Sequence, residues 1–176
     1  MTKISETSYK NINFCIRCGK KLVIETDREN KLRPRCESCG WIYYKNPIPA
    51  VACVIFNKKN ELLIIKRKVE PKSGEWALPS GYMEIYQNPQ QTAIAEMQEE
   101  TGLIGEVDQF LDFYFGYSPI YERIISFGFL MRIIGGELCA GDDAAEACFV
   151  PLDKLPEIAF DAHKHYINLA KNLAAD

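Results

Sequence analysis

The sequence predicts an α/β domain, in which helices flank a mixed β-sheet, preceded by a small metal-bound module. Three observations predict it: apolar strand-like segments separated by turn residues, one strongly capped helix between them, and two close cysteine pairs near the N-terminus. The 176 residues are enough for one well-buried domain and a small module. We therefore expect a ribbon over residues 1–45 and a larger domain over residues 46–176.

The composition is that of a globular protein, with 47% hydrophobic and 26% charged residues. A net charge of -3 argues against nucleic acid as a partner, because phosphate-backbone binding favours a basic surface. The N-terminal stretch is polar, and no segment approaches the ~20 apolar residues of a membrane span. An odd cysteine count of seven, without a secretion signal, indicates a reducing compartment. We expect a cytoplasmic protein without a membrane partner.

The first half of the larger domain reads as short strands. The prolines of Asn46–Pro49 predict an extended connector. Two apolar runs, Val51–Phe56 and Glu61–Lys66, flank the turn Asn57–Asn60 and predict a β-hairpin. A short extended piece follows over Trp76–Pro79 and ends at Ser80-Gly81.

A helix is predicted over Asn88–Thr101. Asn88 is a good N-cap, Pro89 fits the first helical position, and Gln91 completes a spacing like that of a capping box. Gly102 is placed to end the helix. The expected core-facing stripe is Ala93, Ile94 and Met97.

Further strands and a last helix follow. Two long strands are expected around Glu106–Phe115 and Glu122–Ile134, joined by a turn at Tyr117–Pro119. Another strand is expected over Ala147–Val150. Asp161 is expected to cap a helix from Ala162 to about Leu173, which carries His163 and His165 as surface residues.

Two cysteine pairs predict a zinc site. Cys15 and Cys18 are separated from Cys36 and Cys39 by 17 residues, a spacing typical of four-cysteine zinc sites. Four thiolates favour a closed, tetrahedral structural site, and the metal can supply folding energy to so short a segment. A redox pair or coincidence are the alternatives. We favour a scaffold or dimer-interface role for this ribbon.

Three glutamates crowd one face of the predicted central helix. Glu96, Glu99 and Glu100 lie within about 100° of arc. They repel one another, and the helix dipole disfavours negative charge in the last turns. The helix carries no lysine or arginine that would relieve them. A bound divalent cation would relieve the repulsion. Because all the ligands would be oxygen atoms, Mg²⁺ or Mn²⁺ is favoured. A solvated acidic face is the alternative.

The stretch from Gly81 to Leu103 resembles the Nudix box, which is a glycine, five residues, Glu, seven residues, then Arg-Glu-apolar-x-Glu-Glu-x-Gly-apolar. Matching positions are Gly81, Glu96, Met97, Glu99, Glu100, Gly102 and Leu103. The resemblance extends over most of Ala50–Phe160 and implies the Nudix α/β/α sandwich. Gln87 stands where the box has Glu, and Ala95 stands where it has Arg, which puts the orientation of Glu96 in doubt.

The resemblance also implies an activity. The glutamates of the box and the Gly81 carbonyl would hold Mg²⁺ on a pyrophosphate, so that water releases two monophosphates. The junction Asn46–Pro49 and the segment Leu78–Glu84 resemble a group of ribbon-containing enzymes that cleave FAD and ADP-ribose. NADH ranks behind these two substrates, because the signature of NADH pyrophosphatases is missing. The alternative is a nucleotide-sensing or nucleic-acid-binding protein with little or no turnover.

Six accessory residues are further candidates, Glu146 from the resemblance and the others from their positions in the sequence. Glu146 is a candidate for a further catalytic carboxylate, with a surface acid as the equal alternative. Lys66 and Arg67 are candidates for phosphate binding, with a solvated strand edge as the slightly favoured alternative, and Glu84 is a candidate for contact with substrate or metal-bound water. Tyr117 and Tyr121 are the candidates for stacking on an aromatic ring of the substrate. A homodimer is implied at the level of the family.

Overall fold

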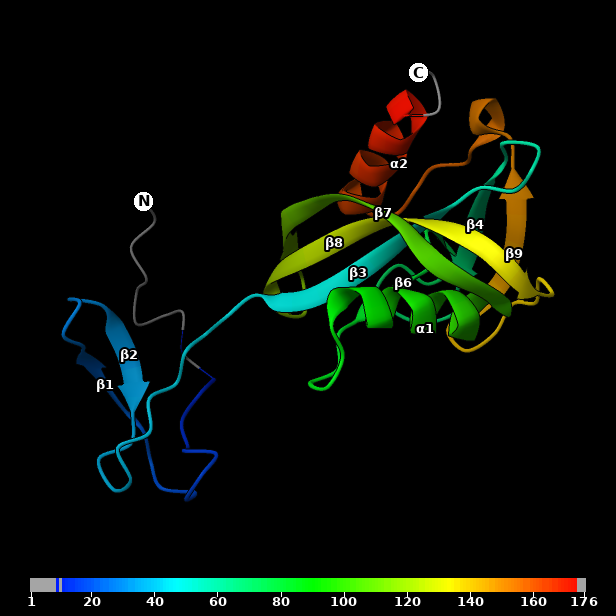
Figure 1. Cartoon of the computed structure of the whole chain (residues 1–176). Helices are drawn as coiled ribbons and strands as arrows, with labels where there is room; N and C mark the ends of the chain where they lie inside the picture. The colour runs from blue at the N-terminus through cyan, green and yellow to red at the C-terminus, as the bar shows by residue number, and fades with distance from the viewer. Residues whose placement is uncertain (1–8, 10, 174–176) are drawn as a thin grey trace. The chain divides into compact units, whose positions relative to one another are not determined.

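The computed structural model describes Tyr9 and residues 11–173, and the chain folds as two compact units that divide between Asn46 and Pro47 (Figure 1). The smaller unit contains one antiparallel pair, β1 (Val23–Thr26) and β2 (Leu32–Arg35). Its core is small and consists of Cys15, Leu22 and Cys36, with Ile12 and Trp41 packed against them. So little apolar surface makes an additional source of stability necessary.

The larger unit contains the expected mixed β-structure, arranged as two sheets. The four-stranded sheet has the order β6-β3-β8-β7, with β3 and β8 parallel and the other neighbours antiparallel. The three-stranded sheet has the order β5-β4-β9 and is antiparallel. The strands are β3 (Ile48–Ile55), β4 (Leu62–Arg67), β5 (Trp76–Ala77), β6 (Ser80–Tyr82), β7 (Leu103–Ser118), β8 (Glu122–Gly136) and β9 (Ala144–Val150).

The predicted hairpin between the first two of these strands is wrong. A single bridge, Phe56 with Leu62, joins them beside the expected turn, and β3 and β4 then enter different sheets. Strand β3 already has β6 and β8 on its two edges, so no edge remains for β4. The sequence could not indicate this, because both strands are continuous apolar runs that suit any buried neighbour.

Helices α1 (Pro89–Thr101) and α2 (Asp161–Leu173) cover opposite faces of the four-stranded sheet (Figure 1). The predicted capping box of α1 is confirmed, because Asn88 and Gln91 each accept a hydrogen bond from the other's backbone amide at 2.9 Å. Gly102 ends the helix with a φ of 69°.

The predicted stripe of α1 is partly wrong. Ala93 and Met97 are buried, but Ile94 is 37% exposed. The buried face of α1 is more polar than predicted. It consists of Thr92, Ala93, Met97, Glu100 and Thr101. The helix therefore buries one of its glutamates and exposes an isoleucine, an arrangement that hydrophobic periodicity does not predict. No helix in the described part of the chain is long and apolar enough to span a membrane.

Helix α2 begins at Asp161, and the prediction that His163 is a surface residue is wrong. Its side chain is 5% exposed, and its Nδ1 accepts a hydrogen bond from the backbone amide of Leu78 at 3.1 Å. Burial, together with the nearby charge of Arg67, lowers the pKa of His163 to about 3. His163 is therefore a neutral hydrogen-bond acceptor that fixes the segment leading into β6.

This burial predicts that His163 makes a contribution to stability that is lost in acid. The folded pKa of His163 lies below the ordinary value of 6.5, so the unfolded chain binds a proton that the folded chain excludes. Stability present above pH 6.5 is lost as the pH falls toward about 3, by up to about 1.4 kcal/mol per pH unit. Urea unfolding of wild type between these values measures the slope.

The matched variants are His163→Asn and Lys164→Gln. Asparagine at 163 keeps an acceptor for the Leu78 amide but cannot titrate, so its slope should be smaller by about one proton. The control at 164 should retain the wild-type slope, because Lys164 is an exposed residue of the same helix and glutamine does not titrate. Equal slopes in wild type and His163→Asn would contradict the assignment.

Candidate active site

The first glutamate of α1 lies directly over strand β6. A β-carbon added at Gly81 would collide with the carboxylate of Glu96, so the two residues approach as closely as a glycine allows. Gly81 pairs with Val51 of β3, whose side chain lies in the core beneath α1. The structure therefore brings together Gly81 and Glu96, which are 15 residues apart in the sequence.

A second glutamate anchors the same strand. Glu100 is 2% exposed, and its Oε2 accepts a hydrogen bond from the backbone amide of Ser80 at 2.7 Å. Glu99, between them on the helix, is exposed. Two carboxylates thus flank Ser80-Gly81. That of Glu96 lies over Gly81, and that of Glu100 accepts a hydrogen bond from the Ser80 amide.

An acidic loop joins this cluster at the end of α1. The backbone amides of Cys139 and Gly141 donate to the last helix carbonyls, those of Thr101 and Glu100, at 2.9 and 3.2 Å. The loop continues into Asp142 and Asp143. The sequence marks these two residues only as part of a turn, and their proximity to the glutamates becomes visible only once the loop is seen to cap the helix.

Burial and repulsion disfavour the ionised glutamates. Burial raises the pKa of Glu96 to about 7, and the charges of Glu99, Asp142 and Asp143 add to the effect. Burial also raises the pKa of Glu100 to about 8, although the Ser80 amide and Arg67 oppose the shift. A cation bound at this cluster would relieve the repulsion, and oxygen donors of this kind suit Mg²⁺ or Mn²⁺.

Arg67, at the end of β4, contributes a positive charge near the buried glutamate. Its guanidinium donates to the carbonyl oxygens of Pro71 at 2.8 Å and Val69 at 3.4 Å and lies 5.3 Å from the ring centre of Phe160. Its charge lowers the pKa of Glu100 and opposes the raised pKa of Tyr82. A fixed positive charge therefore lies beside the carboxylates.

Glu146 forms an ion pair on the neighbouring strand of its sheet. It pairs with Lys66 across β9 and β4, with an Nζ–Oε1 distance of 2.8 Å. Lys66 Nζ also lies 5.7 Å from the ring centre of Trp76. The acids that act on Glu96 are instead Glu99 and the two aspartates of the capping loop. The pair with Lys66 occupies the Glu146 carboxylate, and its catalytic role stays a prediction.

The other accessory candidates divide into two groups. Tyr121 packs edge-on against Tyr82, with ring centres 5.2 Å apart, and Tyr82 directly follows Gly81. Sequence reasoning missed Tyr82, although its place next to the box glycine was a usable signal. Glu84 is exposed in the loop after β6, and Tyr117 is 71% exposed near the end of β7. No described contact brings these last two toward the glutamates.

One residue that departs from the box has a structural use. The side-chain oxygen of Gln87 accepts a hydrogen bond from the hydroxyl of Thr92 at 3.1 Å, and Thr92 is fully buried. Gln87 therefore helps to hold the first turn of α1. Ala95 is half-buried and has no polar side-chain atom with which to orient Glu96.

The four cysteines of the smaller unit form a metal-type cluster. Their sulfur atoms all lie within 4.8 Å of one another, with Cys15–Cys39 at 3.6 Å and Cys18–Cys36 at 3.5 Å. Gly19 and Gly40 follow the pairs with φ values of 70° and 74°, and their amides donate to the carbonyls of Cys15 and Cys36. Two equivalent turns thus present four sulfurs to one point, which fits a tetrahedral zinc ion.

The thiol pKa values in this cluster diverge, because burial and hydrogen bonds to the other three thiols raise the pKa of Cys39 to about 12. The backbone amide of Cys39 and the neighbouring thiols lower the pKa of Cys36 to about 7. Among the described residues, this is the one group of three or more His, Cys, Asp or Glu whose ligand atoms all lie so close together. The carboxylate oxygens of the α1 glutamates do not all lie within 4.8 Å of one another, as the four sulfurs do.

Comparisons with known proteins agree with this geometry. Residues 46–171 match the family model described as the NUDIX domain. The ADP-ribose pyrophosphatase of Methanocaldococcus jannaschii is 44% identical over 124 residues, which are 69% of this chain and 72% of that protein. The NAD-capped RNA hydrolase NudC of Vibrio vulnificus is 25% identical over 152 residues, which are 85% of this chain and 55% of that protein. The chain thus spans about half the length of that relative.

Solved structures show the same fold. The crystal structure of a NUDIX hydrolase from Nitrosomonas europaea superposes with a TM-score of 0.79 at 24% identity and covers 94% of both chains. The NUDIX domain of Shewanella oneidensis NrtR, solved with ADP ribose, has a TM-score of 0.65 at 18% identity. At these identities the likeness concerns the fold.

Proposed function

This chain is a Nudix-family pyrophosphohydrolase, and we propose from that premise that it uses divalent metal ions to split a nucleoside diphosphate linked to a second group into two monophosphates. ADP-ribose and FAD are the favoured substrates, ahead of NADH. The observation that carries the proposal is the position of Glu96 over Gly81, where the charges that act on it are the negative ones of Glu99, Asp142 and Asp143. Such a cluster is stabilised when dications bind it.

Each residue of the cluster has a distinct proposed role. Glu96, Glu99, Glu100 and the Gly81 carbonyl would hold Mg²⁺ or Mn²⁺, which would supply charge neutralisation on the pyrophosphate and alignment of the attacking water. Glu96 is also our first choice for ordering this water. Arg67 lies where its charge can face phosphate oxygens. Water attacks one phosphorus, the anhydride P–O bond breaks, and the second phosphate leaves.

The preference for an ADP-containing substrate has two supports. The relative at 44% identity is named for ADP-ribose. The Tyr82–Tyr121 pair, next to Gly81, offers an aromatic surface against which a flat ring can pack. Fold and box do not set the substrate by themselves, so this preference requires a direct test.

A substrate panel tests the proposal. Purified protein is incubated with ADP-ribose, FAD, NADH or nucleoside triphosphates in the presence of Mg²⁺, Mn²⁺ or a chelator, and the monophosphates are separated by chromatography. We expect AMP from ADP-ribose or FAD, with kcat/KM at least about tenfold above the triphosphates. Chelation should abolish turnover. Tight binding of every compound without turnover would instead favour the nucleotide-sensing alternative, which the loss of the box Glu and Arg motivates.

We also propose that the cysteine cluster holds one structural Zn²⁺. The donor set and the paired turns support zinc rather than a redox role, because four thiolates leave no open coordination position. A cytoplasmic location suits these free thiols, since a reducing compartment prevents their oxidation to disulfides.

A further inference from the structure

Two residues between β5 and β6 carry the chain from one sheet to the other. Strand β5 ends at Ala77 in the three-stranded sheet, and β6 begins at Ser80 in the four-stranded sheet. The crossing therefore consists of Leu78 and Pro79, and it leads directly into Ser80-Gly81 of the candidate active site. Because proline has no backbone N–H, the amide of Leu78 is the single backbone donor of the crossing. Leu78 is fully buried, so this amide requires a hydrogen-bond partner.

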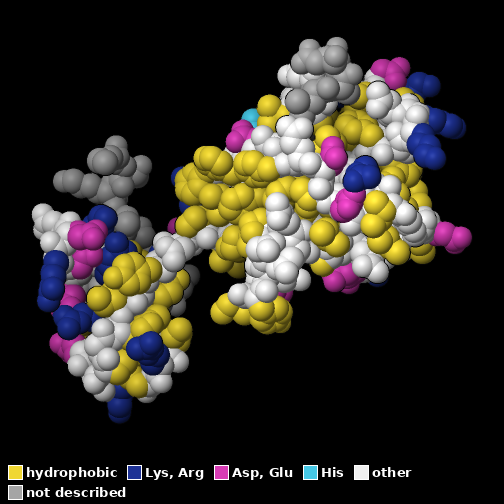
Figure 2. Space-filling view, in the orientation of Figure 1, with side chains coloured by type: hydrophobic (Ala, Val, Ile, Leu, Met, Phe, Trp, Pro, Cys, Tyr) yellow, Lys and Arg dark blue, Asp and Glu magenta, His cyan; other side chains and the backbone are white. Residues whose placement is uncertain are grey.

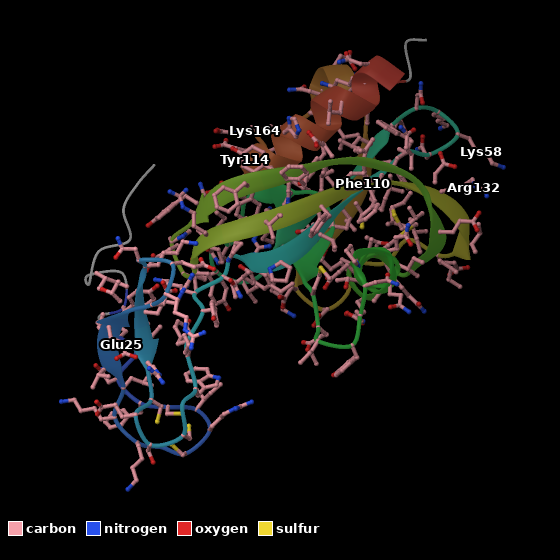
Figure 3. All side chains as sticks on the ribbon, turned by 60° about the vertical axis from the view of Figure 1, so that its left-hand side comes forward. Glu25, Lys58, Phe110, Tyr114, Arg132 and Lys164 are labelled. Carbon is pink, nitrogen blue, oxygen red and sulfur yellow. The ribbon has the colours of Figure 1, made fainter. Side chains whose placement is uncertain are left out.

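His163 of α2 supplies the acceptor for this amide. Its Nδ1 accepts the hydrogen bond from the Leu78 nitrogen at 3.1 Å, so the neutral ring must carry its proton on Nε2. The imidazole also packs edge-on against Phe160, with ring centres 5.0 Å apart, which fixes its orientation. Figure 3 shows Lys164, the next residue, on the outside of the same turn of α2. A buried side chain from a distant helix thus holds the backbone that enters the site.

Two further contacts hold the crossing from other elements. The amide of Cys53 in β3 donates to the Pro79 carbonyl at 2.8 Å, and the amide of Ser80 donates to Glu100 of α1 at 2.7 Å. Helices α1 and α2 pack on opposite faces of the sheet, and Figure 2 shows acidic side chains on the surface beside α1. Strand β6 has only three residues and lies at a sheet edge, so its direction depends on how the crossing is held.

We propose that His163 is a positioning residue for the hydrolytic site, because its bond to the Leu78 amide sets where the Gly81 carbonyl lies relative to Glu96. This role rests on the proposed function, in which that carbonyl and Glu96 hold a dication. Gly81 approaches Glu96 so closely that no β-carbon would fit between them. A small displacement of the crossing would therefore misplace the two ligands. Removal of a group that orients metal ligands typically costs about 10- to 100-fold in metal affinity or activity.

Mn²⁺ titration and steady-state kinetics of the full, zinc-loaded chain test this role. We expect His163→Leu, which removes the acceptor, to weaken Mn²⁺ binding at least about tenfold and to lower kcat more than it raises KM. Asparagine offers an acceptor at a similar position, so His163→Asn should stay within about threefold of wild type in both measurements.

Tyr166→Phe is the matched control. Tyr166 is a fully buried residue of the same helix, and its hydroxyl donates to the Ser126 carbonyl of β8 at 2.7 Å. This variant therefore also removes a buried hydrogen bond between α2 and a backbone group, but away from the crossing. Urea unfolding should show a loss of stability in both Tyr166→Phe and His163→Leu, whereas Mn²⁺ affinity and kcat should fall only in His163→Leu.

A folded His163→Leu with wild-type Mn²⁺ affinity and kcat would overturn the role of His163. So would Tyr166→Phe if it weakened Mn²⁺ binding as much. If the leucine variant does not fold, His163→Gln replaces it. Its acceptor lies one methylene farther from the backbone, so it should bind Mn²⁺ more weakly than His163→Asn, and equal affinities would count against the role. Failure of the hydrolase proposal looks different, because wild type would then bind Mn²⁺ without turning over any compound of the panel, and the affinity comparison would still decide the role of His163.

Discussion

Glu96→Gln is expected to lower kcat/KM by at least about 100-fold, with the fold intact. Glutamine has the same shape, so the side chain can still lie over Gly81, but it cannot carry the negative charge that a dication requires. The interaction between the Glu96 carboxylate and the dication stabilises the transition state more than the bound substrate. We therefore expect kcat to fall more than KM rises. Steady-state kinetics with the best substrate of the panel measure the effect, and isothermal titration with Mn²⁺ measures the accompanying loss of metal affinity.

Glu106→Gln is the matched control for this variant. Glu106 lies on β7, outside the cluster, and forms an exposed ion pair with Arg132. Exposed pairs contribute little to stability, so this substitution should leave both kinetics and metal affinity unchanged. Retention of wild-type activity and Mn²⁺ affinity in Glu96→Gln would show that the acidic face is merely solvated, and the catalytic proposal would fail.

Cys36→Ser is expected to unfold the smaller unit while the larger one remains folded. Cys36 is fully buried in a core of very few side chains, and structural zinc contributes about 10–16 kcal/mol of apparent binding free energy in small zinc modules. A serine cannot replace the thiolate as a ligand. We expect the bound zinc, measured by elemental analysis, to fall from one ion per chain to almost none, and residues 11–46 to become sensitive to protease.

Cys139→Ser is the control for Cys36→Ser. It shows whether loss of zinc and unfolding of the smaller unit require a cysteine of the cluster or follow from the loss of any thiol. Cys139 is an exposed cysteine outside the cluster, so its variant should retain zinc and protease resistance. The thermal transition of residues 47–173 should be nearly unchanged in both variants, because that unit has its own core. Wild-type protein that contains no zinc and nevertheless resists protease in the smaller unit would contradict the zinc assignment.

The sequence by itself determined the local features of this protein. The caps of α1, the spacing of its glutamates, the cysteine pairs and the long β7 and β8 strands all depend on contacts between near neighbours in the chain, and these are specified by residue type. The match to the Nudix box followed from the same local spacing. Family and fold class were therefore predictable before any contact was known.

Tertiary structure alone decided which distant segments meet. Strand partners were not predictable, because two buried apolar strands pair equally well with many others, and the expected hairpin of β3 and β4 instead divides between two sheets. The loop that caps α1 brings Asp142 and Asp143 to the glutamates, and β4 brings Lys66 to Glu146. Burial of His163 and Glu100 likewise follows from packing, since a polar side chain becomes a core residue only where a distant backbone amide is placed to bond with it.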